Sequence, residues 1–154
     1  MFSQRSDFKP VVIQFVVVPA ITNSKLCEEF SLGHSNVLRE FKIPPVNSEI
    51  PVWHNEGNCH ICLVRNMTTK ELIGGGRLHI RSNVEELGLF RLMKELDASF
   101  ELDQNKKDSF SGEIAGLWTK RGFPFRGLST WIISILNLLA RKLNLDQGIA
   151  LCSP

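Results

Sequence analysis

Residues Gly112–Leu143 read GEIAGLWTKRGFPFRGLSTWIISILNLLARKL, and they carry the clearest structural signal in the chain. The apolar run Gly112–Thr119 predicts a strand, and Lys120–Arg126 predicts a basic turn that contains Gly and Pro. Leu128–Leu143 predicts a long apolar helix with cationic residues in its last turn, where they suit the helix dipole. A strand that enters a helix through a short turn is typical of α/β architecture.

The flanking sequence adds further strands and helices. Before the quoted stretch we predict a strand at Val11–Val18 that is buried on both faces, then a helix capped by Thr22 or Asn23 that runs to about Phe41. The apolar side of that helix carries Leu26, Phe30, Val37, Leu38 and Phe41. A hairpin of strands at Cys59–Arg65 and Glu71–Ile80 and a helix at Val84–Phe100 follow, and a short strand at Gly148–Cys152 comes after the quoted stretch. The order β α β β α β α β predicts an α/β or α+β fold with a mixed central sheet flanked by helices. Within the second hairpin strand, the run Gly74–Gly76 indicates a bulge, or a close approach by a ligand or another backbone.

Composition places the chain among ordinary globular proteins. With 154 residues, 43% of them hydrophobic, it has the size of one domain spanning residues 1–154. The net charge of +2 and the pI of about 8.4 are too mild to favour nucleic acid. The apolar stretch Trp131–Ala140 is far shorter than the roughly 20 residues that a membrane span needs, so we expect no span. Val11–Val18 lacks the features of a signal peptide, and the four scattered cysteines favour reduced thiols, so we expect a cytoplasmic protein.

The basic turn has the chemistry of an anion site. The first N–H groups of a helix have no intrahelical partner, and the helix dipole places partial positive charge there. Lys120, Arg121 and Arg126 add charge, while Gly122 and Gly127 allow an anion to approach the backbone. A pyrophosphate suits such a site. The alternative is a plain strand-to-helix connection whose basic residues are solvated.

Glu113 is a carboxylate inside an otherwise apolar strand, just before the basic turn. Desolvation favours the protonated form of such a group, so it could take a proton near neutral pH. The alternative is an outward-facing carboxylate in a structural ion pair with Arg or Lys. We expect the carboxylate to lie beside the head of the Leu128 helix.

The order of elements, together with Phe110–Ser129 (FSGEIAGLWTKRGFPFRGLS), resembles the GNAT superfamily of N-acyltransferases in its fourth strand, pyrophosphate loop and following helix. Within this superfamily, the sequence most resembles the acyl-homoserine-lactone synthases and the long-chain N-acyl amino acid synthases. In both, an Arg follows a small-residue run in the third strand, as in Glu71–Ile80 (ELIGGGRLHI). A helix-containing insert, here Val84–Asp108, then precedes a motif similar to Glu-x-x-x-Leu-Trp.

The resemblance implies an enzyme that moves an acyl group from an acyl-CoA or acyl-carrier-protein thioester to a small-molecule amine, with no metal. Glu113 would act as general base, often through water, and Arg77 would support the site or the acceptor. The thioester would lie along Leu117 and Trp118, whose backbone would pair with its pantetheine arm. The residues that would cradle the pyrophosphate, or the phosphate of a carrier protein, are Arg121, Arg126, Gly127, Leu128 and Ser129.

Three departures from the family pattern shape the expectation. Pro124 and Phe125 interrupt the start of the phosphate loop, which leaves a carrier protein open as donor. Gly116 replaces the Arg that lactone synthases carry three residues after the Glu, which argues against lactone synthesis. The sequence ends at Pro154, where the family continues with a helix and two strands, so the expected fold lacks these elements. A fragment, a second chain or homodimer that completes the sheet, and a degenerate module that binds an acyl ligand or partner subunit without catalysis are the alternatives.

Other candidate sites are weaker. His54, Cys59, His60 and Cys62 could supply zinc ligands, but in a strand Cys59 and Cys62 point to opposite faces, which is poor chelate geometry. Cys152 has no activating neighbour in the sequence, so we expect a small apolar residue rather than a nucleophile. We expect Trp131 to pack in the core, with the lining of an acyl pocket as its alternative role.

Overall fold

The computed structural model describes residues 11–43, 52–55, 57–81, 88–99, 111–123 and 126–150. The elements are β1 (Ile13–Pro19), η1 (Ala20–Thr22), α1 (Ser24–Glu40), η2 (Val52–Asn55), β2 (Cys59–Asn66), β3 (Leu72–Arg81), α2 (Gly88–Leu96), β4 (Ser111–Thr119), α3 (Leu128–Lys142) and β5 (Gln147–Ala150). The predicted order of strands and helices is therefore confirmed.

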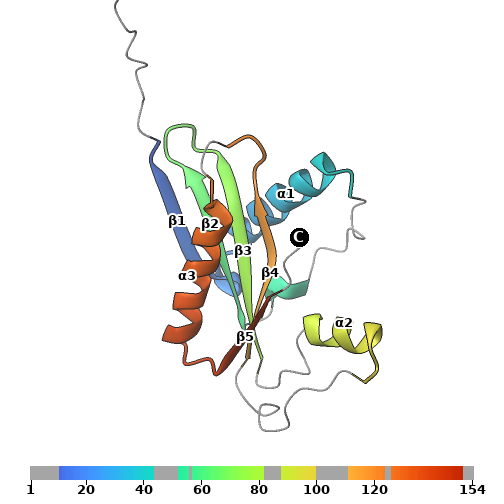
Figure 1. Cartoon of the computed structure of the whole chain (residues 1–154). Helices are drawn as coiled ribbons and strands as arrows, with labels where there is room; N and C mark the ends of the chain where they lie inside the picture. The colour runs from blue at the N-terminus through green and yellow to red at the C-terminus, as the bar shows by residue number, and fades with distance from the viewer. Residues whose placement is uncertain are drawn as a thin grey trace, which may run out of the picture.

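The five strands form one mixed sheet in the order β1-β2-β3-β4-β5. The first four are antiparallel to their neighbours, and β5 runs parallel to β4. Helix α3 covers one face of the sheet, and α1 lies across the other (Figure 1). This three-layer arrangement confirms the predicted α+β fold, and the described part of the chain ends with β5. Among the described helices, none combines the length and the apolar character that crossing a membrane requires.

Each face of the sheet has its own hydrophobic core, because side chains alternate along β2. Cys59, Ile61 and Leu63 point toward α1, and Cys62 and Val64 point toward α3. The two cysteines thus lie on opposite faces, as predicted. The helix residues at the centres of the two cores are Cys27, Phe30 and Val37 on α1 and Leu128, Ile132 and Leu136 on α3.

The glycine run in β3 exists because neighbouring groups approach the strand closely from both faces. A Cβ at Gly75 would lie 3.0 Å from the Phe30 ring, and one at Gly76 would lie 2.9 Å from a methyl group of Ile132. These close neighbours are side chains of the two packing helices, whereas the sequence analysis expected a ligand or another backbone. A register shift between Gly75 and Arg77 in the β3–β4 ladder adds the expected bulge.

Several local predictions were wrong. β1 is an edge strand of the described sheet, so its side chains are only partly covered, and Val17 is 37% exposed. Asn23 precedes α1, but its side chain donates to the carbonyl of Pro19 at 2.9 Å instead of capping the helix. Phe41 lies just beyond the end of α1 and is 58% exposed, because the packed face of that helix ends at Val37.

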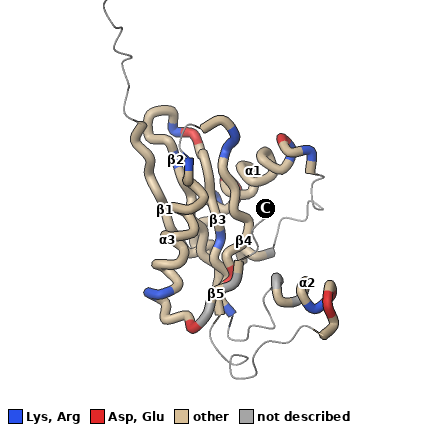
Figure 2. Tube along the Cα trace, viewed as in Figure 1, with Lys and Arg blue, Asp and Glu red and all other residues tan. Residues whose placement is uncertain are grey.

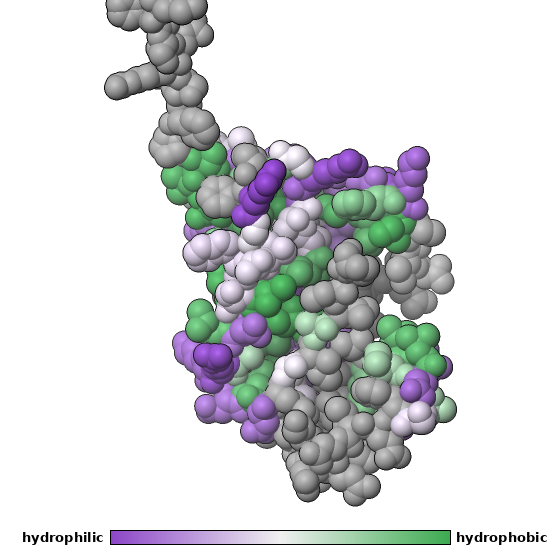
Figure 3. Space-filling view, in the orientation of Figure 1, coloured by the Kyte–Doolittle hydropathy of each residue, from purple (hydrophilic) through white to green (hydrophobic). Residues whose placement is uncertain are grey.

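The predicted apolar faces of α2 and α3 also need correction. Helix α2 is shorter than the predicted Val84–Phe100, and residues 84–87 and 100 lie outside the described part of the chain. Leu96, expected on its buried side, is 75% exposed. Trp131 is 60% exposed on the outer side of α3 instead of packed in the core. Figure 3 shows the α3 face of the molecule, where hydrophobic side chains reach the surface.

Candidate functional site

Within the part of the chain that the structure describes, strand β4 has an open edge at its C-terminal half. β5 pairs with β4 only from Ser111 to Ile114. Within the described residues, no strand pairs with Ala115–Thr119 on that side, and Figure 1 shows β5 meeting β4 only near its start. The backbone groups of an open edge are available to pair with an extended ligand.

A β-bulge lies at the point where the edge opens. Gly75 pairs with Trp118 and Arg77 pairs with Ala115, so Gly116 and Leu117 together oppose one residue of β3. Gly116 adopts a φ of +56°, a conformation that favours glycine. A bulge leaves the extra residue outside the ladder and re-aims its backbone. Gly116 also has little room for a side chain, since a Cβ there would lie 3.0 Å from Nε of Arg77.

The turn after β4 delivers the chain to the head of α3. Gly127 precedes the helix in a left-handed conformation with a φ of +85°, and no side chain caps the helix there. The first helical hydrogen bond runs from the N–H of Trp131 to the carbonyl of Gly127 at 3.1 Å. The N–H groups of Leu128 and Ser129 therefore precede the helical ladder and are available to an anion.

The structure places two of the predicted donor-binding residues, Trp118 and Leu128, side by side at one end of β4. A Cβ at Gly74 would lie 3.2 Å from the Trp118 carbonyl oxygen and 3.3 Å from a Leu128 methyl group, so the strand end and the helix head are neighbours. Arg126 is exposed beside Gly127. Arg121 is also exposed, and its guanidinium carbon lies 6.0 Å from the centre of the Phe41 ring beyond α1. Figure 2 shows basic positions at this upper end of β4. Pro124 and Phe125 lie outside the described residues.

Glu113 does not lie beside the helix head, so that expectation was wrong. Ile114 and Leu117 pack in the α3 core, and alternation therefore turns Glu113 toward the α1 face. Thr119 lies six residues after Glu113 along β4, which corresponds to about 20 Å of strand. The half-buried carboxylate and the predicted anion site thus occupy opposite ends of the same strand.

The α1 face around Glu113 carries several polar side chains from β3. His79 is the register partner of Glu113, and Arg77 is its diagonal neighbour on the same face. The Arg77 guanidinium lies over the Trp53 ring, 4.7 Å from its centre, while Nε2 of His79 lies 3.8 Å from Sγ of Cys59. The register thus brings Arg77 and Glu113 to the same face of the sheet.

Helix α1 contributes His34 to the polar face around Arg77. Its ring centre lies 6.2 Å from that of Phe30. Burial lowers the pKa of His34, and the charge of Arg77 lowers it further. The sequence analysis did not identify His34 or His79. His79 could have been found from its spacing of two from Arg77 in a strand, whereas no local signal distinguishes His34.

No cluster of three potential metal-binding side chains occurs within the described segments. Cys59 and Cys62 could not join in one site because they lie on opposite faces of the sheet. Cys152 lies outside the described residues.

No protein-family model matches the chain, and no curated protein matches it in sequence. Solved structures do match the fold. A predicted acetyltransferase from Clostridium acetobutylicum, solved with acetyl-CoA, has a TM-score of 0.61 at 12% identity, over 92% of this chain and 82% of that one. An aminoglycoside N-acetyltransferase in complex with CoA has a TM-score of 0.60 at 10% identity, over 96% and 81% of the two chains.

A ribosomal-protein-alanine N-acetyltransferase from Brucella melitensis is also similar, with a TM-score of 0.55 at 7% identity, over 90% of this chain and 78% of that one. The chain therefore has the GNAT fold that these N-acetyltransferases share.

Proposed function

We propose that this protein is an N-acyltransferase that moves an acyl group from a thioester donor to an amine. The observation that carries the proposal is the open, bulged edge of β4 between a half-buried carboxylate and the head of α3. Similarity to acetyltransferases solved with acetyl-CoA and CoA supports this choice over other uses of an open edge.

The donor would lie extended along the open edge of β4. Its amide-containing arm would pair with the backbone at Leu117 and Trp118, and its phosphates would meet the N–H groups of Leu128 and Ser129. Arg126 and Arg121 would add positive charge, and Gly127 would let the phosphates approach the backbone. The thioester carbonyl would then reach the bulge, where an N–H of the Gly116–Leu117 segment would stabilise the developing oxyanion.

The acceptor amine would approach from the α1 face. Glu113 would remove one proton from the ammonium form, directly or through water, so that the neutral nitrogen can attack the thioester carbon. The tetrahedral intermediate would collapse with cleavage of the C–S bond, and the thiolate would take up the second proton lost by the nitrogen. Arg77, next to Glu113 on this face, would orient the acceptor.

Replacement of the base tests the assignment most directly. In Glu113→Gln we expect kcat to fall by about 10²–10⁴-fold, the usual contribution of a positioned base, with little change in donor affinity. Glu95→Gln, an exposed carboxylate on α2, is the matched control and should keep wild-type turnover. Acyl-CoA and acyl-carrier protein would be assayed against a panel of amines that includes amino acids, the acceptors of the long-chain N-acyl amino acid synthases. Wild-type turnover by Glu113→Gln would show that the base is another group.

The second candidate is a non-catalytic module that binds an acyl ligand or a partner subunit. The interruption of the phosphate loop at Pro124 and Phe125 favours it. Donor binding without turnover for any amine in the panel would support this module over the enzyme.

A further inference from the structure

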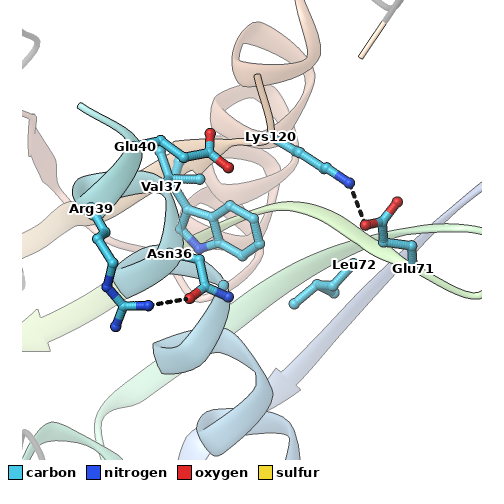
Figure 4. A pocket seen from close by; sticks show the side chains of 9 residues that line it. Asn36, Val37, Arg39, Glu40, Glu71, Leu72 and Lys120 are labelled. Carbon is cyan, nitrogen blue, oxygen red and sulfur yellow. Dashed lines mark hydrogen bonds and ion pairs between the residues drawn. The ribbon is translucent and has the colours of Figure 1, made fainter. Parts of the chain in front are cut away.

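A cavity of about 450 Å³ lies between the C-terminal part of α1 and the end of β4 (Figure 4). Polar side chains at its rim already have partners within the chain. Nη1 of Arg39 donates to Oδ1 of Asn36 at 3.3 Å, and Nζ of Lys120 pairs with Glu71. The free edge of the sheet at β1 differs from the cavity, because its outer backbone groups have no partner among the described residues. This edge is therefore the stronger place to expect contact with another molecule.

Strand β1 forms the border of the described sheet that lies farthest from β4 and β5. Its inner side pairs with β2 in one continuous register from Ile13 to Pro19. Within the described residues, no strand pairs with its outer side, and Figure 1 shows β1 at the border of the sheet. The row of N–H and C=O groups on the outer side can therefore pair with a strand from another molecule.

The ladder with β2 identifies which residues of β1 present their backbone outward. The N–H of Met67 donates to the carbonyl of Val12 at 2.8 Å, so the backbone groups of Val12 point toward β2. These directions alternate along an antiparallel pair that has no register shift, so every second residue after Val12 also bonds to β2. The residues in between present an N–H and a C=O outward, and they are Ile13, Phe15 and Val17.

These three outward-facing residues are spaced symmetrically about Phe15. A second copy of β1, placed antiparallel with Phe15 opposite Phe15, would bring Ile13 of each copy opposite Val17 of the other. Each of the three opposed pairs would exchange two N–H···O=C bonds, which gives about six hydrogen bonds. Both copies would use the same residues, and this self-complementarity is the mark of a closed two-fold dimer.

The sequence of β1 lacks the usual protection against such pairing. Natural edge strands are commonly blocked by charged side chains, by bulges or by Pro. Ile13–Pro19 reads IQFVVVP, which contains no charged residue and has its Pro at the last position, and the pairing with β2 has no bulge. An uncharged strand can lie against its own copy without like-charge repulsion, and it offers no charge by which a different partner could be selected. A second copy of the chain is therefore the occupant that the strand fits.

Exposed apolar side chains flank this edge on the α3 face. Val17 lies on that face because its partner Cys62 packs in the α3 core, and it is 37% exposed. Trp131 and Leu138 are 60% and 63% exposed, and their spacing of seven places them on one side of α3. Figure 1 shows α3 in front of the sheet, running opposite to β4. Because Ile132 faces the sheet, the right-handed turn of the helix directs Trp131 and Leu138 toward the β1 side.

We propose that this protein forms a two-fold symmetric dimer in which the β1 strands of two copies pair antiparallel about Phe15. One sheet would then run through both copies, and the apolar side chains beside β1 would flank the joined strands. Aromatic residues such as Trp131 are enriched in protein interfaces. The proposal goes beyond the acyl transfer proposed above and does not depend on it, since the open part of β4 lies away from β1 and stays free for the donor.

Sedimentation equilibrium of the full chain, combined with hydrogen exchange followed by NMR, tests the proposal. We expect a species with twice the 17.4 kDa mass of one chain. The amides of Ile13, Phe15 and Val17 should exchange slowly in this dimer and quickly after dilution to the monomer. The amides of Gln14 and Val16 donate to β2 in both states, so their protection should change little and provides an internal control.

Two variants place a charge at the proposed interface. Val17→Lys and Val12→Lys change residues that are 37% and 57% exposed in one copy, where a Lys side chain can reach water. We expect each to weaken dimerisation by about 100-fold, or about tenfold at each of the two equivalent sites in a symmetric dimer. Leu32→Lys, 63% exposed on α1, is the matched control and should dimerise as the wild type does. Circular dichroism would establish that each variant is folded, and Val12→Lys decides the test if Val17→Lys is not.

The remaining outcomes refute the proposal. A wild-type protein that stays monomeric up to its solubility limit would do so. A dimer that both folded interface variants leave intact, or one that leaves the amides of Ile13, Phe15 and Val17 unprotected, would place the contact elsewhere. Loss of the dimer in Leu32→Lys as well would show that association does not depend on the β1 edge. Acyl transfer is assayed separately, so none of these results decides the proposed function.

Discussion

Gly33→Ala should destabilise the protein, although the same change in most helices stabilises it. Ala is favoured over Gly in a helix interior by about 1 kcal/mol. At this position of α1, however, a Cβ would lie 2.4 Å from two ring atoms of Trp118, where ordinary contact requires about 3.5 Å. Trp118 is only 5% exposed, and its ring centre lies 6.2 Å from that of Phe30, so the indole has little room to move away from an added methyl group.

The expected size of the effect follows from these opposing terms. Overpacking of a core costs about 1–3 kcal/mol, and an overlap of more than 1 Å on a rigid ring belongs at the upper end of that range. After subtraction of the helix-propensity gain, we expect a net loss of about 1–2 kcal/mol. For a domain of this size, the melting temperature should fall by about 2–8 °C. Urea unfolding followed by far-UV circular dichroism would measure the change in free energy.

A double-mutant cycle with Trp118→Leu identifies the cause. Removal of the indole should relieve the overlap, so Gly33→Ala should stabilise the Trp118→Leu background by about 1 kcal/mol. The reasoning fails if Gly33→Ala raises the urea midpoint of the wild type, or if it has the same effect in both backgrounds.

Three further predictions concern the turn, the histidines and a buried thiol. Gly127→Ala should cost about 1–2 kcal/mol because a Cβ in the left-handed conformation is strained, and donor affinity in a titration should fall with it. Burial lowers the pKa values of His34 and His60 below their ordinary value of 6.5, so the unfolded chain takes up more protons than the folded one as the pH drops below 6.5. The free energy of unfolding, measured with urea, should therefore keep the full contribution of these histidines above pH 6.5 and fall below it. The fall should be less steep in His34→Gln. A stability that rises on acidification would contradict this assignment. Burial raises the pKa of the Cys62 thiol to about 12, so iodoacetamide at pH 8 should not label Cys62 in the native protein but should label it in urea, as mass spectrometry would detect.

The sequence predicted the elements well because their signals are local. The β-branched run Val11–Val18 and the apolar helix that begins at Leu128 have periodicities that neighbouring residues alone determine, and both elements are present. The degree of burial was less predictable, since it depends on which strand takes the edge of the sheet. β1 takes an edge, and its composition, suited to a central strand, does not reveal that.

The part of the candidate site that the sequence predicted is the part whose residues are close together in the sequence. The strand, the turn and the helix head are contiguous in sequence, so their proximity at Trp118 and Leu128 could be inferred. His79 lies beside Glu113 only because β3 pairs with β4. His34 comes from helix α1, which is distant from β4 in the sequence. Contacts of this kind depend on strand register and helix packing. The spacing of His79 from Arg77 indicates a shared face of one strand, but it gives neither the register nor the packing.

Under the proposed function, the separation of Glu113 from the helix head restricts the shape of the donor more than the expected proximity would have done. A carboxylate beside the helix head could serve a compact molecule that carries its phosphate close to its reactive group. With about 20 Å of strand between Glu113 and Thr119, a compact molecule can reach the carboxylate or the helix head but not both. A ligand that uses both must be long and extended and must lie on the open edge of β4, where the bulge at Gly116 interrupts the ladder part of the way along. A thioester on a long phosphorylated arm meets each of these requirements. A short acyl phosphate carries the negative charge but lacks the length and the extended shape.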